Sequence, residues 1–244
     1  PSLFRHVVED TKSAPHDTIS DPEIVNKVMR TLQRQSTFHW NLEKDDLGCS
    51  FDRINSVTKT LTKLWNVAAF VAQFDLETIK VKEKVGSEVE PHELDPDLLD
   101  VTLTDMDKWI IYEINSIIKF SRECCEKYDF HNPAIRIRNF LWETFASHYI
   151  ELVKNRAYNQ NNKFDAHEQR SAVFTLHYCL SNTLTLLAPV VPFVTEVLYK
   201  EIYKADVHNE NFPKDMILEE PRIKTDDIME LDNKIWKAKK LGLE

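Results

Sequence analysis

The chain has 244 residues, a formal net charge of −9 and a hydrophobic share of 42%. This size and composition are typical of a globular protein with a well-buried core. The acidic balance argues against a protein that coats nucleic acid through bulk charge, although one face of an acidic body can still be basic. Only three glycines occur, and no glycine-rich phosphate-binding motif can be written, so we expect no nucleotide-binding α/β domain.

The first 50 residues are poorly periodic, apart from a short helical candidate at 22–35. The pattern changes at Phe51, after which apolar residues recur at three- and four-residue steps as far as residue 74. This spacing predicts an amphipathic helix. Residues 77–103 then hold two prolines, a glycine and many acidic side chains, which is typical of a connection rather than a core element.

Capping residues predict where the later helices begin. They are Thr104 with Asp107, then Asn132 with Pro133 at the first helical position, and Asp165 with Glu168. The predicted helices cover residues 107–128, 133–158, 166–187 and 193–203. Long helices joined by short loops predict an all-α antiparallel bundle. After residue 204 we expect a loosened chain and then a short basic helix that ends at Gly242.

No motif for catalysis or metal binding is present. The nine histidines form no H-E-x-x-H pair, no G-x-S-x-G elbow occurs, and the paired carboxylates lie in polar connections. The four cysteines lack zinc-site spacing and are expected to be buried free thiols in a reducing cytosol. With no signal core and no membrane-spanning run, we expect a cytoplasmic protein that is not a self-contained enzyme.

Residues 119–170 carry two more basic than acidic side chains in an otherwise acidic chain. Four residues of types that bind RNA lie at one corner of the predicted bundle: Lys154, Arg156, Tyr158 and Lys163. Single-stranded RNA is read by stacking on aromatic rings, with cations on the phosphates. The helix dipole alone favours basic residues in a last turn by ~0.3–1 kcal/mol. Spacing by itself therefore leaves RNA binding open.

Four segments in order resemble the helical domain of class I aminoacyl-tRNA synthetases for aliphatic amino acids, most closely the valyl members. They are LTKLWNVAAFV at 61–71, DKWIIYEIN at 107–115, FLWETFASHYIELVKNRAY at 140–158 and LLAPVVPFVTEVLY at 186–199. The resemblance implies that residues 51–204 form a helical anticodon-binding domain. It implies that residues 1–50 connect it to an absent catalytic core and that 205–244 begin an appended C-terminal region.

The resemblance also implies a role, which is to bind the anticodon stem-loop of tRNA, and of tRNA(Val) in particular. The residues then expected to contact RNA are Lys63, Asn66, Lys154, Arg156, Tyr158 and Arg170. Two positions depart from the family pattern: Ala69 stands where an arginine is usual, and Ala188 where a histidine is usual. Trp142 keeps the family pattern, and we expect it to be a core residue.

No signature of the family's catalytic core is present, so we expect no cofactor in this chain and no activity from it alone. By resemblance, ATP and Mg belong to a full-length parent enzyme, whose catalytic and editing domains would be partners of this chain. Two alternatives stay open. One is the corresponding domain of an isoleucyl or leucyl enzyme, and the other is a helical protein-interaction module without RNA binding, which the acidic charge and Ala69 favour.

Overall fold

The computed structural model describes residues 51–76, 101–160, 162–218 and 221–228, with the single positions 230 and 234. The predicted segment 1–50 and most of the connection at 77–103 lie outside these residues. The chain divides into two compact units, Pro1–Ala69 and Phe70–Glu244. The described residues contain helices and no strand, so the predicted all-α class is confirmed.

Helix α3 spans Phe51–Val71, and its residues as far as Ala69 make up the whole described part of the first unit. Its start coincides with the change in periodicity at residue 51. The buried residues recur at three- and four-residue steps along it: Leu64, Trp65, Val67, Ala68 and Val71. The predicted amphipathic helix is therefore confirmed.

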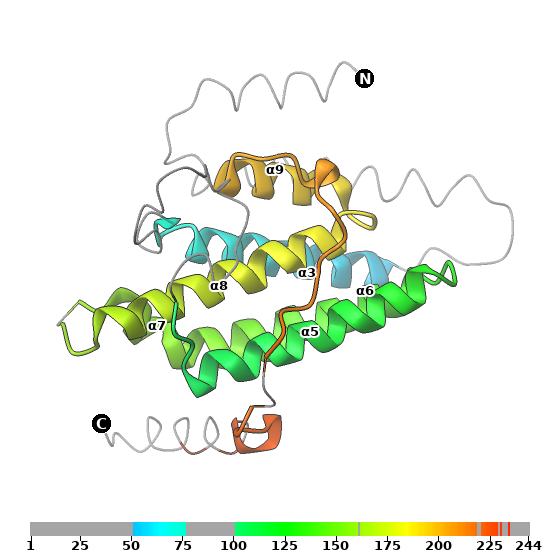
Figure 1. Ribbon diagram of the computed structural model, residues 1–244. Coiled ribbons are helices and arrows are strands. Elements are labelled where there is room, and N and C mark those ends of the chain that lie inside the picture. Colours follow the sequence, from blue (N-terminus) through cyan, green and yellow to red (C-terminus); the bar gives the residue numbers. More distant parts are fainter. Residues whose placement is uncertain are drawn as a thin grey trace, which may run out of the picture. The chain divides into compact units, whose positions relative to one another are not determined.

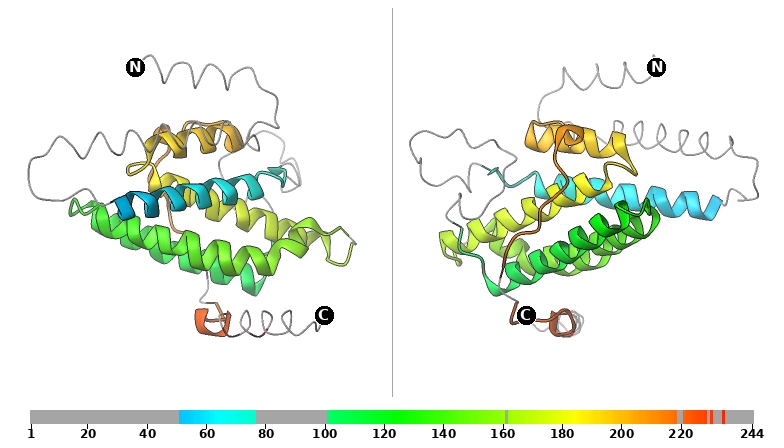
Figure 2. Two further views of the ribbon diagram at one scale, coloured as in Figure 1. Left: turned by 180° about the vertical axis from the view of Figure 1, so that it is seen from behind. Right: turned by 45° about the vertical axis from the view of Figure 1, so that its right-hand side comes forward.

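The second unit contains the remaining helices, and its long helical segments, at residues 105–125, 131–158, 166–187 and 192–203, each run antiparallel to the one before (Figures 1 and 2). The helices of this unit are α5 at Asp105–Cys125, α6 at His131–Asn139, η3 at Phe140–Tyr149, α7 at Ile150–Tyr158, α8 at Ala166–Leu187, α9 at Pro192–Tyr203 and the short 3-10 helix η4 at Val207–Asn209. Because α6, η3 and α7 follow one another without a break, they form one continuous helical run. The sequence predicted each of the four long segments to within a few residues.

The middle of that run, η3, is a π-helix, whereas the sequence predicts an ordinary α-helix. The Ile150 N–H donates to the Phe145 carbonyl, five residues earlier. This wider winding brings residues five apart onto one face. The Phe140 and Phe145 rings accordingly stack with centroids 5.9 Å apart, and Tyr149 continues the stack 6.1 Å from Phe145. The stack lies in the core, because all three residues are buried.

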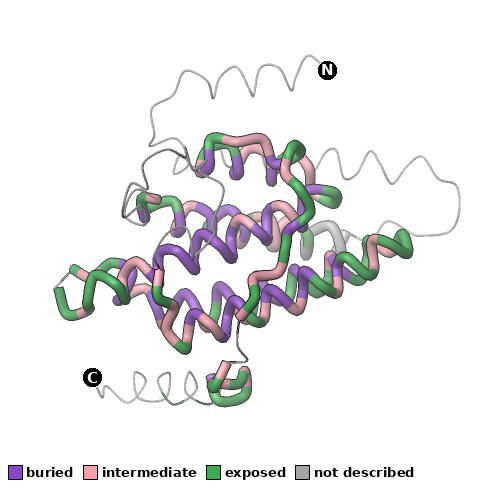
Figure 3. Tube along the Cα trace, in the orientation of Figure 1, coloured by how far each residue is buried: buried purple, intermediate pink, exposed green. Residues whose placement is uncertain are grey.

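Helix α8 is the central helix of this unit. Residues 171–180 are buried without interruption (Figure 3), and the helix contacts α5, α7 and α9. At its start the backbone N–H of Asp165 donates to Glu168 Oε2 at 3.0 Å, which confirms the predicted capping box.

The start of α6 differs from the prediction. The helix begins at His131, and the Asp129 carboxylate accepts hydrogen bonds from the backbone N–H groups of His131 and Asn132, each at 3.1 Å. Asp129 therefore does the capping that the sequence analysis assigned to Asn132. Pro133 lies within the first turn, where a missing N–H costs nothing.

The chain after α9 is fastened to α5 and is not the loosened chain that the sequence predicts. The Pro213 carbonyl accepts from Arg122 at 2.8 Å, and the Asn115 side chain bonds both backbone groups of Met216, at 2.8 and 3.1 Å. Further along, Trp109 donates to Thr225 at 3.1 Å. The extended segment thus runs along α5 against its direction (Figure 1). Residues 225–228 are helical; most of the predicted basic helix lies outside the described residues.

Candidate nucleic-acid interface

Tyr158, the last residue of α7, stands at a corner of the second unit with 40% of its surface exposed. Its ring lies 5.0 Å from the Phe74 ring and 6.0 Å from the Phe70 ring, centroid to centroid. Its hydroxyl donates to Gln73 Oε1 at 2.8 Å. The ring is therefore held on two sides by apolar contacts and a hydrogen bond, while part of it stays open to solvent.

Lys154 lies one helical turn before Tyr158 and so shares its face of α7. Its ammonium group pairs with Glu151 at 2.7 Å, and both side chains are partly exposed. Pairs three or four residues apart on a helix surface contribute only ~0.2–0.5 kcal/mol, so a phosphate can compete for the ammonium at small cost. Lys163 is exposed in the loop that follows α7. The corner therefore combines a half-exposed ring with two cations on neighbouring parts of the chain.

The loop after α7 is fixed by its own hydrogen bonds. Asn159 ends the helix in the left-handed conformation, with φ 45°, and its side chain bonds both backbone groups of Phe164, at 3.0 and 3.1 Å. Gln169 on α8 donates to the Ala157 carbonyl at 2.9 Å. These bonds hold the loop against both helices, so the corner is organised before any ligand arrives.

Arg156 does not lie on the surface, although the sequence analysis placed it on RNA. It is 8% exposed, pairs with the Asp107 carboxylate, and donates to Thr104 Oγ1 at 2.7 Å. A guanidinium committed to a buried carboxylate is not available to a phosphate, because separating the pair would leave two uncompensated charges. The predicted phosphate contact is therefore inconsistent with the structure, and we assign Arg156 to the architecture of the bundle.

Asp107 is the centre of a buried polar network that the sequence analysis missed. Its carboxylate, which is fully buried, accepts hydrogen bonds from Arg156, from Ser171 on α8 and from the Tyr149 hydroxyl, the last at 2.6 Å. Thr104 also donates to it at 2.7 Å. One side chain thus joins the start of α5 to η3, α7 and α8. The spacing of Thr104 and Asp107 was the available signal, and it indicated only a helix cap, which is confirmed.

The charges in this network depend on one another. Burial acts to lower the pKa of the Arg156 guanidinium, but Asp107, Tyr149 and Glu168 outweigh it and leave that pKa raised. Burial, with Asp107 next in importance, raises the pKa of the Tyr149 phenol well above its usual value. Arg156 is therefore a fixed cation and Tyr149 a neutral donor throughout the ordinary pH range.

The other predicted contacts lie in different settings. Arg170 is half-buried on α8, where its Nε donates to the Ala166 carbonyl at 3.2 Å. Lys63 is half-buried and Asn66 is exposed, both on the part of α3 that belongs to the first unit. Within the second unit, the structure thus brings together Lys154 and Tyr158 and adds a partner set that sequence reasoning missed, namely Phe70, Gln73 and Phe74.

Trp142 also differs from expectation. It is half-buried rather than fully inside the core, and the Arg138 guanidinium lies over its ring at 5.9 Å from the centroid. Within the residues that the structure describes, we find no group of three or more metal-binding side chains. The same residues contain no helix with the length and apolar character needed to cross a bilayer.

Comparison with known proteins identifies the domain. The family model described as the anticodon-binding domain of tRNA ligase matches residues 107–242. The chain belongs to this family. The match continues through the segment that α5 holds, so it reaches past the predicted boundary at residue 204.

Several proteins with similar sequences are named valine–tRNA ligases. The chain is 35% identical to the enzyme of Pyrobaculum aerophilum over 62% of this chain and 16% of the relative. It is 31% identical to that of Aeropyrum pernix over 73% of this chain and 20% of the relative. It is 32% identical to the enzyme of Anaplasma marginale over 70% of this chain and 19% of the relative. These relatives confirm the resemblance seen in the four sequence segments, and the chain spans at most about a fifth of their length.

Proposed function

We propose that this chain is the anticodon-binding part of a valine–tRNA ligase and holds the anticodon stem-loop of tRNA(Val). Its family membership and the names of its relatives support this proposal. The relatives quoted above are all valine enzymes, which favours valine over the isoleucine and leucine alternatives. A protein-interaction role without RNA has no comparable support.

The corner around Tyr158 carries the proposal. An unpaired base can stack on the exposed part of this ring, since every base has a flat face and such stacking needs no particular sequence. Phe70, Phe74 and Gln73 hold the ring in place. Lys154 and Lys163 are the cations for the phosphates on either side.

In this proposal, ATP, Mg and the chemistry of valine attachment belong to other parts of a longer polypeptide. The catalytic and editing domains would be neighbours of this domain in that polypeptide, and this chain alone would be inactive. We also propose a cytoplasmic location, in keeping with the free thiols at Cys124, Cys125 and Cys179.

The decisive substitution is Tyr158→Ala. Because base stacking on an aromatic ring contributes ~1–3 kcal/mol, we expect the Kd for a tRNA(Val) transcript to rise about fivefold to a hundredfold. Tyr128→Ala is the matched control, since Tyr128 is 86% exposed and lies just after the far end of α5. The measurement is a filter-binding titration with the 244-residue chain. Equal affinities for the two variants would refute the assignment of Tyr158.

The same titration tests the cations. Replacing Lys154 and Lys163 by alanine should flatten the dependence of log K on log salt by ~0.7 for each single-strand phosphate that the chain no longer neutralises. Lys200→Ala on α9 is the control, because Lys200 is exposed on another helix. If no variant changes affinity or slope, and tRNA(Val) is bound no better than tRNA(Ile), the proposed function fails.

A further inference from the structure

The turn after α3 holds the Tyr158 ring, and the turn's own hydrogen bonds are local. The Gln73 N–H donates to the Phe70 carbonyl at 3.2 Å, and the Phe74 N–H donates to the Val71 carbonyl at 3.0 Å. Each bond spans three residues, so the two bonds fix the shape of the turn but not its position on the bundle. That position depends on contacts with other helices of the second unit.

His177, in the middle of α8, makes such a contact. Its Nε2 lies 2.9 Å from the Phe74 carbonyl oxygen, across 103 positions of the sequence. Burial lowers the pKa of His177 to about 4, so the imidazole is neutral at pH 7. Because a carbonyl oxygen can only accept, Nε2 carries the proton and donates it to this bond. Both residues are buried, so the bond is shielded from competition by water.

The donor itself has little freedom to move. The Tyr203 hydroxyl on α9 donates to the His177 carbonyl at 3.0 Å. The two rings also meet edge to face, with centroids 5.8 Å apart and planes at 76°. Tyr203 is as deeply buried as His177. Helices α8 and α9 together therefore hold the imidazole, and the imidazole in turn holds the turn after α3.

Packing alone does not explain a histidine at this position. Its Nδ1 has no partner among the described residues, and a buried polar atom without a partner costs free energy. An apolar side chain of similar volume would avoid this cost, but it would leave the Phe74 carbonyl without the donor it now has. The residue type therefore fits a need for a hydrogen-bond donor against this turn.

We propose that His177 is a positioning residue for the RNA-binding corner. The Phe74 ring lies 5.0 Å from the Tyr158 ring, centroid to centroid, and Gln73 accepts the Tyr158 hydroxyl at 2.8 Å. A shift of the turn would therefore move both supports of the Tyr158 ring. His177 is buried, so it acts through these residues and not on RNA. This inference rests on the proposed function of Tyr158 in binding tRNA.

The hold on the turn is tested without RNA, by hydrogen–deuterium exchange of the 244-residue chain. His177→Leu removes the donor at similar volume, and His177→Gln keeps an N–H near the position of Nε2. In a peptide that covers residues 70–76, the backbone amides should exchange faster in His177→Leu than in the wild type. They should exchange at close to the wild-type rate in His177→Gln. Circular dichroism checks that both variants are folded.

The effect on RNA is tested by titration with a tRNA(Val) transcript. His177→Leu should raise the Kd by about twofold to tenfold, the value of one hydrogen bond, and His177→Gln should restore most of the affinity. If His177 acts through Tyr158, the two substitutions are not additive. In a Tyr158→Ala background, His177→Leu should therefore cause no further loss of affinity, whereas a general loss of stability would add to it.

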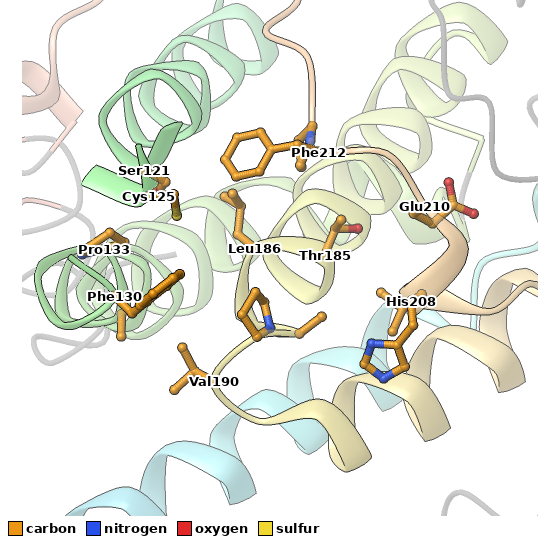
Figure 4. A pocket seen from close by; sticks show the side chains of 15 residues that line it. Ser121, Cys125, Phe130, Pro133, Thr185, Leu186, Val190, His208, Glu210 and Phe212 are labelled. Atoms are coloured by element: carbon orange, nitrogen blue, oxygen red, sulfur yellow. The ribbon is translucent and has the colours of Figure 1, made fainter. Parts of the chain in front are cut away.

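His208 provides the matched control. Its Nε2 lies 3.3 Å from the Pro192 carbonyl, so it makes the same kind of contact at the other end of the bundle from Tyr158. There it lines a cavity of about 240 Å³ whose other residues include Ser121 and Phe212 (Figure 4). His208→Leu should change neither the exchange at residues 70–76 nor the affinity for tRNA(Val).

The possible results separate this inference from the proposed function. If the wild-type chain does not bind tRNA(Val), the proposed function fails and the positioning role fails with it. If the wild type binds and His177→Leu binds equally well, the positioning role alone is overturned. It is also overturned if exchange at residues 70–76 is unchanged in His177→Leu, or if the effects of His177→Leu and Tyr158→Ala add.

Discussion

The two ends of the α5–α8 helix pair differ in their contacts, because one end is held by a buried polar network and the other by apolar side chains around a cavity. At the end that contains Asp107, a buried carboxylate joins four helical segments, and several hydrogen bonds satisfy it. At the end that contains Ser121, apolar side chains surround a cavity, and a buried hydroxyl has no partner among the described residues. A satisfied polar network fixes one geometry, whereas a buried group without a partner costs free energy and fixes none.

This difference bears on the proposed RNA corner. Arg156 lies in the network, and Tyr158 lies two residues further along the same helix. The network therefore fixes the part of α7 that presents Tyr158 and Lys154. A surface whose side chains are already in place binds with less loss of conformational entropy. We interpret the Asp107 end as the support of the corner.

The largest expected effect comes from breaking the network. Asp107→Ala removes the acceptor for Arg156, Tyr149 and Ser171 and leaves the guanidinium buried without its countercharge. Breaking one partner of a buried pair costs ~3–5 kcal/mol, so the free energy of unfolding should fall by about that much. Urea denaturation followed by circular dichroism measures the change.

Asp105→Ala is the matched control for this variant, because Asp105 is an exposed acid in the same first turn of α5. It should cost no more than ~1 kcal/mol through the helix dipole. The double variant Asp107→Leu with Arg156→Met should recover much of the stability, since an apolar pair can replace a buried ion pair. Equal destabilisation by Asp105→Ala and Asp107→Ala would show that the network contributes little.

A second prediction concerns His177, which lies in the middle of α8 and has a hydrogen-bond partner at only one of its two ring nitrogens among the described residues. Its Nε2 lies 2.9 Å from the Phe74 carbonyl, while Nδ1 has no partner among the described residues. Burial lowers the pKa of His177 to about 4, against a small opposing effect of the Phe74 hydrogen bond and Asp75. The imidazole is therefore neutral in the folded protein at pH 5–6.

The direction in which stability changes with pH follows from the pKa of His177 in the unfolded chain, 6.5, and in the folded chain, about 4. Between pH 6.5 and about 4 the unfolded chain binds a proton on His177 and the folded chain does not, so stability is lost as the pH falls through this window. A depression of this size corresponds to about 3 kcal/mol. In urea titrations from pH 7 to 4, His177→Gln should lose less stability than the wild type. His208→Gln, an exposed control, should follow the wild type; parallel curves for all three would contradict the prediction.

Much of the fold could be predicted from the sequence, because the helices depend on local patterns. Apolar periodicity defined α3, and two capping boxes with Thr104 and Asp165 marked the starts of α5 and α8. Both boxes consist of contacts three residues apart, which is why the sequence showed them. The π-helical winding of η3 was missed, since it depends on how Phe140, Phe145 and Tyr149 stack within the core.

The candidate site was predicted less well, because its contacts link distant parts of the chain. Lys154 and Tyr158 are close in sequence, and their spacing was enough to find them. The Tyr158–Gln73 hydrogen bond spans 85 positions, and the Arg156–Asp107 pair spans 49. A local pattern could show Asp107 as a cap and Arg156 as a basic helix end, but not that the two meet inside the bundle.

The same substitution at both ends gives the finest test of the contrast. Ser171→Ala removes a donor to the Asp107 carboxylate, and hydrogen bonds to charged groups contribute ~1.5–3 kcal/mol, so this variant should be less stable by about that amount. Ser121→Ala removes a hydroxyl that has no partner among the described residues, so its stability should stay within ~0.5 kcal/mol of the wild type or rise slightly. Both are read from urea midpoints at an unchanged slope.

Because Ser121 and Ser171 are both buried and helical, the change in helix propensity and in buried surface is the same in the two variants. Any difference in stability between the two variants then measures how much each hydroxyl contributes to the free energy of unfolding. If both variants are destabilised equally, the Ser121 hydroxyl is hydrogen-bonded in solution and the contrast between the ends disappears. If only Ser171→Ala is destabilised, one end is held by polar contacts within the chain, while at the other the buried hydroxyl contributes nothing to stability.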